Sequence, residues 1–495
     1  MAAEPKSLPI QIRHADRLYI DGAWVAPKSG ARIEVISPHT EQVAAVVAAA
    51  GPADMDLAVA AARKAFDSGP WPRLTHAERA GYLMKLADEL EKRMPEIARA
   101  WTEQVGALQS GAPGMIGFVT SMVRYYAGLA DKFPFVETHQ PSDGRGAARV
   151  VREPVGVVAA IVPWNAPYMI MINKVCPALL TGCTVVMKPA PETPLEAYII
   201  AEAAEAAGIP PGVVNLTPAD RDASDHLISN PGIDKVSFTG STAVGKRIGA
   251  VCGARIGRFG LELGGKSAAI VMDDFDVGEA ATILANTISI MCGQVCATLS
   301  RAVVPRARHD QYVEAVAAEL KALRVGDPYD PKSQMGPLAM KRQLTRVEGY
   351  MEKGKAEGAQ LVCGGKRASA PARGYYFEPT LFARASSRMT IAQEEIFGPV
   401  ITLIPYDDEA DALRIANDSS YGLFGAVFTH DDALAWRIAR GVRTGWMSQN
   451  GFRMDWFLPF GGFKQSGIGR EGGAAGVAAY TEVKTILLDG APPGV

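Results

Sequence analysis

The chain has 495 residues, of which 48% are hydrophobic and 21% charged, so an ordinary globular protein with two or three domains is expected. Its formal net charge of −2 gives no electrostatic reason to expect nucleic acid or a membrane as partner. Six cysteines are too few for a disulfide scaffold of this size, which favours a reducing, cytoplasmic setting.

The first predicted elements are a hairpin over 18–25, with a turn at Asp21-Gly22, and helices over 54–67 and 75–104. A β-branched run predicts one strand over 148–161. Strands at 156–162, 184–187, 212–216, 234–238 and 267–271 then alternate with helices near 168–180, 194–206, 222–229 and 241–251. A second set has helices at 309–323, 409–417 and 431–439 and strands near 400–405 and 424–428. This alternation predicts two α/β domains with parallel sheets, meeting near 260–270.

The stretch 155–172 carries no charge and could be mistaken for a membrane span. Pro163, Asn165 and Pro167 lie at its centre, where a spanning helix would lose backbone hydrogen bonds. We interpret it as a buried strand, a sharp loop and the start of a helix. Because the first 22 residues also lack the apolar segment of a signal peptide, we expect a soluble protein.

The stretch "VSFTGSTAVGKR", 236–247, places Gly240 and Gly245 where a strand gives way to a helix whose first amides could hold an anion. The spacing matches a phosphate-binding P-loop except that Arg247 replaces the Ser or Thr that would hold magnesium. An NTPase, or a glycine-capped helix with no ligand, therefore remains an alternative at this point.

The stretch "MCGQVCATLSR", 291–301, places Cys292 and Cys296 four residues apart. None of the seven histidines is near in sequence, the spacing has no second pair and no CxxC is present, so neither a metal site nor a redox pair is expected. A buried cysteine is ordinarily inert, and Cys292, in an apolar run, keeps that interpretation. Cys296 follows a turn-prone Gly-Gln, where a thiolate could be approached.

Two further residues have chemistry suited to catalysis. Glu262 lies between apolar residues and glycines in "GLELGGKS", a setting that should raise its pKa towards that of a general base. A lone glutamate is more often solvated, but few surface glutamates have such neighbours. Asn165, in "VPWNAP", presents an amide donor in a rigid loop after a strand, where an oxyanion-stabilising group is expected.

Taken together, these stretches resemble the aldehyde dehydrogenase superfamily, in its NAD(P)-dependent, non-acylating form, from about residue 18 to residue 486. The resemblance is carried by seven motifs in order: "PWN" at 163–165, "KP" at 188–189, "FTGS" at 238–241, "LELGGK" at 261–266, "GQxC" at 293–296, "EEIFGPV" at 394–400 and "PFGGFKQSGIGRE" at 459–471. Any one could arise by chance, but the ordered set makes an NTPase a remote alternative.

The resemblance implies that Cys296 is the nucleophile that attacks an aldehyde to form a thiohemiacetal. Asn165 and the backbone amide of Cys296 would hold the oxyanion, hydride transfer to the cofactor would leave a thioester, and Glu262 would activate the water that hydrolyses it. A CoA-acylating semialdehyde dehydrogenase normally lacks the base, so Glu262 favours hydrolysis. A non-catalytic protein of this fold would be expected to have lost Cys296 or Glu262.

The cofactor roles also follow from the resemblance. It places Ser241 and Trp164 at the pyrophosphate, Lys188 at the adenine ribose, Glu395 at the nicotinamide ribose and Phe397 beside the nicotinamide. The cofactor-binding set is Trp164, Lys188, Gly240, Ser241, Gly245, Leu263, Glu395 and Phe397, with no metal ligand.

The stretch "KPAPETP" departs from the family's Lys-Pro-x-Glu, because Pro191 occupies the position of that glutamate and Glu192 comes one residue later. Pro191 can neither bond the ribose nor repel a 2′-phosphate. We expect NAD as the preferred cofactor, since 186–195 holds no additional arginine or lysine, with NADP tolerated better than in relatives that keep the glutamate.

The resemblance implies a Rossmann-like dinucleotide-binding domain at 8–135 and 153–262 and a catalytic domain at 263–472, each built on a doubly wound parallel sheet. Residues 136–152 and 473–495 would form a small β oligomerisation element, which implies a homo-oligomer, a dimer or a tetramer.

The positions that the resemblance implies for the substrate channel are mainly apolar: Ala166, Ile170, Asn173, Val295, Ala297, Met454 and Trp456. A medium-chain or aryl aldehyde is the expected substrate, and Arg453 would meet an anionic one, although a loop arginine is more often solvated.

Overall fold

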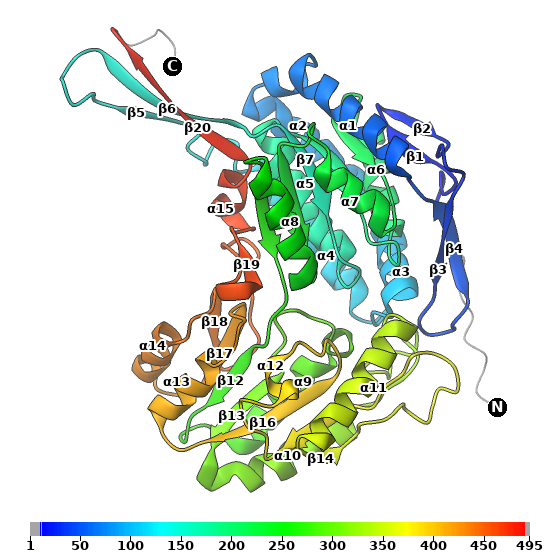
Figure 1. Ribbon diagram of the computed structural model, residues 1–495, viewed down its shortest axis with the longest axis vertical. Coiled ribbons are helices and arrows are strands. Elements are labelled where there is room, and N and C mark those ends of the chain that lie inside the picture. The colour runs from blue at the N-terminus through cyan, green and yellow to red at the C-terminus, as the bar shows by residue number, and fades with distance from the viewer. Residues whose placement is uncertain (1–9, 11, 491–495) are drawn as a thin grey trace.

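The computed structural model describes residues 10 and 12–490, which form two α/β bodies and a projecting three-stranded arm (Figure 1). The α/β class and the parallel sheets expected from the alternating pattern are confirmed. The domain boundaries predicted from the sequence stay a prediction.

The first body contains a sheet of eight strands, parallel from β11 to β9 and antiparallel at its edges. Its order is β19 (Gly467–Ile468), β11 (Arg258–Glu262), β10 (Lys235–Thr239), β7 (Val157–Ile161), β8 (Thr184–Lys188), β9 (Val214–Leu216), β1 (Leu18–Ile20) and β2 (Ala23–Val25). The predicted hairpin at 18–25 is present, with Asp21 and Gly22 both at positive φ in its turn.

Helices cover both faces of this sheet, as alternate residues of β7 show. Val158 and Ala160 pack into one core with α2 (His76–Lys92), α3 (Met94–Val105), α4 (Ala112–Ala127), α5 (Pro167–Thr181) and α6 (Leu195–Ala206). Val157, Ala159 and Ile161 pack into the opposite core with α1 (Pro52–Asp67), α7 (Arg221–Ser229) and α8 (Thr242–Ala254). Because successive strand residues face opposite ways, an unbroken apolar strand must be buried on both sides.

The second body contains a seven-stranded sheet that is parallel except at the β14–β15 edge. Its order is β14 (Gln360–Cys363), β15 (Thr380–Ala383), β16 (Val400–Tyr406), β13 (Arg301–Pro305), β12 (Ala268–Val271), β17 (Phe424–Phe428) and β18 (Trp446–Gln449). One core holds α9 (Val277–Ser289) and α10 (His309–Ala322), and the other holds α13 (Glu409–Asn417) and α14 (Asp432–Gly441). The remaining helices are α11 (Lys341–Ala356), α12 (Thr390–Gln393) and α15 (Gly473–Ala478).

The arm is an antiparallel sheet of β5 (Val136–His139), β6 (Ala147–Pro154) and β20 (Thr481–Leu488). It projects from the first body (Figure 1) and carries exposed apolar side chains at Val136, Val483 and Leu487.

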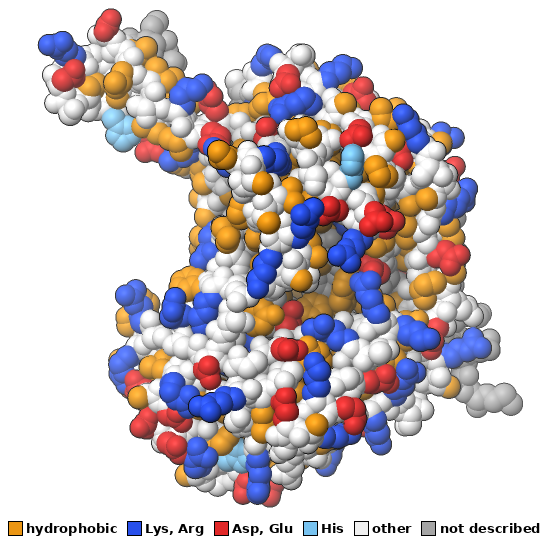
Figure 2. All heavy atoms as spheres, viewed as in Figure 1, with side chains coloured by type: hydrophobic (Ala, Val, Ile, Leu, Met, Phe, Trp, Pro, Cys, Tyr) orange, Lys and Arg blue, Asp and Glu red, His pale blue; other side chains and the backbone are white. Residues whose placement is uncertain are grey.

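A separate hairpin pairs β3 (Arg32–Ile36) with β4 (Val43–Ala48). Basic and acidic side chains are interspersed over the face in Figure 2. Among the described helices, none combines the length and apolarity needed to cross a bilayer.

Two element predictions were wrong in detail. The single strand expected at 148–161 is β6 and β7, which belong to different sheets and are separated at Gly156. Gly156 has a φ of +127°, and a Cβ there would lie 1.8 Å from the Asp234 carboxylate, so only glycine allows this change of direction. The helix expected at 75–104 breaks at Arg93, because Pro95, the second residue of α3, cannot donate a backbone hydrogen bond.

Candidate active site

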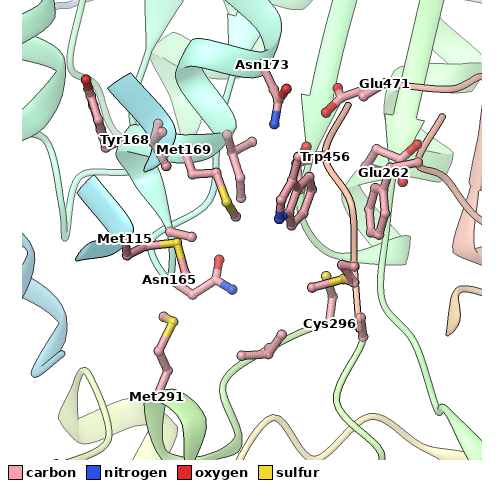
Figure 3. A pocket seen from close by; sticks show the side chains of 18 of the residues that line it. Met115, Asn165, Tyr168, Met169, Asn173, Glu262, Met291, Cys296, Trp456 and Glu471 are labelled. Atoms are coloured by element: carbon pink, nitrogen blue, oxygen red, sulfur yellow. The ribbon is translucent and has the colours of Figure 1, made fainter. Parts of the chain in front are cut away.

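Two cavities meet at Cys296, one of about 330 Å³ and one of about 490 Å³. The smaller lies between α4, α5 and the 452–460 segment and is mostly apolar, as Figure 3 shows in close-up. The larger lies beside the N-terminus of α8 and the 395–397 loop. Both cavities are lined by Asn165, Ile170, Thr239, Leu263 and Cys296. A thiol at this junction can be reached from two sides by two different molecules.

The loop before Cys296 is held in an uncommon conformation. Met291, Cys292 and Gly293 all have positive φ, and a Cβ on Gly293 would lie 2.2 Å from the Gly398 carbonyl oxygen. The fully buried Gln294 side chain accepts a hydrogen bond from the Ala339 amide at 2.9 Å and donates to the Met291 carbonyl at 2.8 Å. The Gly-Gln pair therefore fixes the turn that presents the following cysteine.

Cys296 is the one cysteine that is not buried; the other five, at 176, 183, 252, 292 and 363, lie in the cores. Cys292 is fully buried, and burial raises the pKa of its thiol well above the ordinary value. Burial also raises the pKa of the Cys296 thiol to about 12, with smaller contributions from the charges of Glu395 and Glu262. Hydrogen bonds from the backbone amides of Cys296 and Ala297 oppose this rise. Those amides face the sulfur, where an oxyanion would also form.

Asn165 is brought beside Cys296, as its motif predicted. It is 6% exposed and lies in the loop between β7 and α5. Its carbonyl accepts a hydrogen bond from Trp101 Nε1 at 3.0 Å, and its side-chain Nδ2 donates to the Gln294 carbonyl at 2.9 Å. One of the two amide hydrogens is therefore used to hold the side chain, and the other is available in the cavity.

Glu262 is the last residue of β11 and lines the smaller cavity. It is 4% exposed, and its Oε2 has no hydrogen-bond partner among the described residues. Burial raises the pKa of this carboxyl well above its ordinary value, the charge of Glu471 raises it further, and Lys174 and Arg470 act in the opposite direction. A carboxyl whose pKa is raised in this way is a stronger base than an exposed glutamate once it is ionised.

Glu471 lines this cavity and forms an ion pair with the buried Lys174 behind it, a pair that the motif analysis did not identify. Lys174 lies on α5 and is fully buried, and its ammonium group donates a hydrogen bond to Glu471 Oε1. A lysine within the apolar run "YMIMINKVCPALL" was the available signal, because a buried charge requires a partner. Arg453, in contrast, is exposed and does not line the cavity.

The larger cavity gathers most of the residues predicted to bind a cofactor: Trp164, Gly240, Ser241, Leu263, Glu395 and Phe397. Ser241 is the N-cap of α8, its hydroxyl accepting from the Val244 amide at 3.4 Å, so the first amides of the helix face the cavity side. The rings of Trp164 and Phe397 meet edge to face at 5.3 Å. Thr239 Oγ1, on the same wall, is buried without a partner among the described residues.

The loop that carries Glu395 and Phe397 is held by α11. Arg346 donates to the Glu395 carbonyl at 2.6 Å, and Gln343 donates to the Phe397 carbonyl at 2.6 Å. These contacts hold Phe397 at a φ of +61°, which is rare for a residue with a side chain. Glu395 Oε1 accepts from the Gly265 amide at 3.0 Å, and burial raises the pKa of its carboxyl to about 7.

Gly245 and Lys188 do not line the larger cavity. A Cβ on Gly245 would lie 2.7 Å from the Leu263 side chain, so this glycine allows α8 to pack against Leu263. Lys188 ends β8, and burial lowers the pKa of its ammonium to about 8, partly opposed by Glu192. Arg342, which does line the cavity, contacts Glu192 at 2.6 Å. A cation from α11 thus lies beside the segment that contains Pro191.

The chain is similar to known proteins over almost its whole length. The family model described as the aldehyde dehydrogenase family matches residues 24–486. Geranial dehydrogenase of Castellaniella defragrans is 43% identical over 96% of this chain and 98% of its own, and 3-succinoylsemialdehyde-pyridine dehydrogenase of a Pseudomonas species is 40% identical over 96% and 99%.

The chain is also similar to solved structures. Mycobacterium tuberculosis aldehyde dehydrogenase complexed with NAD⁺ superposes with a TM-score of 0.92 at 44% identity, covering 97% of this chain and 99% of its own. A mutant of aldehyde dehydrogenase C from Pseudomonas syringae, in complex with NAD⁺ and octanal, superposes with a TM-score of 0.94 at 37% identity, covering 99% and 100%.

Proposed function

The chain belongs to the aldehyde dehydrogenase family, and we propose that it oxidises an apolar aldehyde to the carboxylic acid with NAD⁺ through a thioester on Cys296. The observation that carries this proposal is the position of the Cys296 thiol, where an apolar cavity meets a second cavity suited to a dinucleotide. The complexes of the two solved relatives with NAD⁺, and of one of them with octanal, support the choice of both ligands.

The residues of the larger cavity fit a nicotinamide dinucleotide. The N-terminus of α8, with Gly240 and Ser241 in the cavity lining, provides a helix end suited to a pyrophosphate. Glu395 provides a carboxylate for ribose hydroxyls, Trp164 and Phe397 provide flat apolar surfaces, and Thr239 Oγ1 is a buried group that lacks a partner. When bound, the cofactor would supply the acceptor for the hydride. Leu263 would pack against it, and Lys188 would act near the adenine ribose.

The protein's own residues would then carry the other steps. The Cys296 thiolate would attack the aldehyde carbon, and the new oxyanion would receive hydrogen bonds from the free Asn165 amide hydrogen and the backbone amide of Cys296. After oxidation to the thioester, Glu262 would remove a proton from a water that attacks the acyl carbon. The carboxylic acid would leave, and the thiol would be restored.

The thiol pKa of about 12 means that the resting site holds very little thiolate at neutral pH. Two of the groups that raise it are the carboxylates Glu395 and Glu262, whose own pKa values are raised. When either carboxylate takes up a proton, its unfavourable interaction with a thiolate disappears. The three groups are therefore expected to titrate as a coupled set.

The presence of Glu262 favours hydrolysis over transfer of the acyl group to CoA. The decisive experiment is a panel of aldehydes with purified protein and NAD⁺, with and without CoA, in which reduced cofactor and acid product are both measured. Acid formation that does not require CoA is expected. Products found only as CoA thioesters, or no oxidation of any aldehyde, would contradict the proposal.

The projecting arm supports a homo-oligomer, a dimer or a tetramer. Its strands β5, β6 and β20 expose Val136, Val483 and Leu487 to solvent in a single chain, and such a surface is usually covered in an assembly. Light scattering of the purified protein would give the mass. The six free cysteines favour a reducing, cytoplasmic setting, which cell fractionation would test.

A further inference from the structure

The wall of the apolar cavity carries a hydrogen-bond donor that the proposed reaction does not use. Asn173 lies on α5 and is 2% exposed, and the described residues offer its Nδ2 no hydrogen-bond acceptor. Figure 3 shows its amide nitrogen directed towards the open space of the cavity. A buried amide donor that faces a mostly apolar cavity is costly unless a ligand or a water pairs with it.

A hydrogen bond from a buried tyrosine orients this amide. The Tyr126 hydroxyl donates to Asn173 Oδ1 at 2.8 Å. Because Oδ1 accepts from Tyr126, the NH₂ group of Asn173 is the part of the amide that faces the cavity. Tyr126 is itself fully buried, so water does not compete for the contact.

The position of Asn173 places this donor away from the reacting carbonyl. It lies seven residues after Ala166, which is the N-cap of α5 and adjoins Asn165. At 1.5 Å per residue, this corresponds to about 10 Å along the helix axis. Met169 and Ile170, which line the cavity between them, are apolar. The indole N–H of Trp456, opposite α5 in Figure 3, also has no acceptor among the described residues.

The charged residues around the cavity determine which kind of hydrogen-bond acceptor a substrate can place against this wall. Glu262 and Glu471 line the same cavity, whereas the lysine partner of Glu471 is already engaged. A third carboxylate, carried by a substrate, would be desolvated beside these two, and the described lining of the cavity contains no lysine or arginine to pair with it. Arg453, the candidate for an anionic substrate, lies outside the cavity.

We propose that the substrate is an aldehyde whose apolar chain carries one neutral hydrogen-bond acceptor, such as a ketone, an ether oxygen or a ring nitrogen, which Asn173 binds. This rests on the proposed aldehyde oxidation and adds the chemistry of the substrate's distal part. Asn173 thus acts as a specificity residue, and Tyr126 orients it. An aldehyde with a terminal carboxylate is rejected.

The test compares three kinds of substrate of matched length: nonanal, a set of oxo-nonanals in which the ketone is moved along the chain, and a semialdehyde with a terminal carboxylate. In the native protein, kcat/KM is highest for one position of the ketone. In Asn173→Leu, which has nearly the same shape without the donor, the ratio of that oxo-nonanal to nonanal falls about fivefold to tenfold. Tyr126→Phe frees the amide to turn and gives a smaller fall.

The matched control is Met169→Leu, one helical turn earlier on the same wall, which changes shape without changing polarity and leaves the ratio unaltered. Substrate binding to Cys296→Ala, followed by tryptophan fluorescence, separates binding from turnover. A ratio that is the same in Asn173→Leu as in the native protein, with nonanal still oxidised, overturns this inference but not the proposed function. Equal loss of activity on all aldehydes would instead place Asn173 in the common reaction. Failure to oxidise any aldehyde would overturn the proposed function itself.

Discussion

The side-chain nitrogen of Asn165 donates a hydrogen bond to the main-chain oxygen of Gln294 at 2.9 Å, so the loop after β7 is tied to the loop that presents Cys296. Gln294 is in turn anchored to Ala339. The two loops belong to the two α/β bodies, and the Asn165 amide is therefore held beside the thiol before any substrate arrives. A donor positioned in advance is the arrangement that favours a developing oxyanion.

The first prediction concerns that donor. Asn165→Ala should lower kcat/KM by about 100-fold to 1000-fold, the usual effect of losing one oxyanion-stabilising hydrogen bond. Asn165→Asp keeps the shape but replaces the donor with a negative charge, and it should be at least as damaging. Steady-state kinetics with one aldehyde measures both. An Asn165→Ala variant within tenfold of the native protein would remove Asn165 from this role.

The second prediction separates the two cysteines of the stretch 291–301, Cys292 and Cys296. Cys296→Ser should abolish aldehyde oxidation, because a hydroxyl in this buried site is a far weaker nucleophile than a thiolate. Cys292→Ser should retain much of the activity, although it places a hydroxyl in a fully buried core and should lower the thermal unfolding midpoint. Comparable losses of activity in both folded variants would contradict the assignment of Cys296.

The third prediction concerns Glu262 and pH. Burial raises the pKa of this carboxyl well above its ordinary value, and only the carboxylate form can accept a proton from water. Hydrolysis of the thioester should therefore accelerate as pH rises through this pKa. In Glu262→Gln this rise of the hydrolysis rate with pH should disappear. An acyl adduct should accumulate on Cys296, detectable by intact-protein mass spectrometry. A variant that cannot be acylated at all would show that Glu262 acts earlier, on the thiol.

The fourth prediction concerns the choice between NAD⁺ and NADP⁺. Pro191 offers no carboxylate to repel a 2′-phosphate, and Arg342, paired with Glu192, lies beside the same segment. The native protein should therefore accept NADP⁺ with a modest penalty, and Pro191→Glu should enlarge the preference for NAD⁺. Arg342→Met should weaken NADP⁺ more than NAD⁺ if it helps to hold the phosphate. The measurement is the ratio of kcat/KM with NAD⁺ to kcat/KM with NADP⁺, in the native protein and in each variant. A ratio in Pro191→Glu equal to that of the native protein would contradict this account.

The fifth prediction concerns stability. The guanidinium of Arg301 is buried and donates to the carbonyls of Lys266, Ile415 and Ala416 at 2.9–3.0 Å. Arg301→Met would leave these oxygens without donors, at a cost of about 3 kcal/mol or more. Arg306→Met, which removes only an exposed ion pair with Asp407, should cost less than about 1 kcal/mol. Thermal unfolding of the two variants side by side gives the comparison, and equal midpoints would refute it.

Much of the site was predictable because its residues lie in short motifs with special local requirements. The Gly-Gln before Cys296 and the carboxylate in "LELGGK" each mark a turn or a strand end, and such features depend on neighbouring residues. Strands alternating with helices likewise indicate parallel sheets, because hydrophobic periodicity is local. One error occurred where periodicity could not distinguish alternatives: β6 and β7 follow one another closely, and only Val155 and Gly156 separate them.

What the sequence determined by itself, then, was the class of fold, the family and the chemical groups available for the reaction. Only the tertiary structure decided how residues far apart in the chain combine: the pairing of Lys174 with Glu471, the approach of Arg342 to Glu192, and the direction in which Asn173 presents its amide. These depend on contacts of α5 with the C-terminal segment and with α4, and of α11 with the loop between β8 and α6. Such contacts are set by the packing of whole elements against a shared core, and a local sequence pattern does not specify which distant side chain will fill a given position.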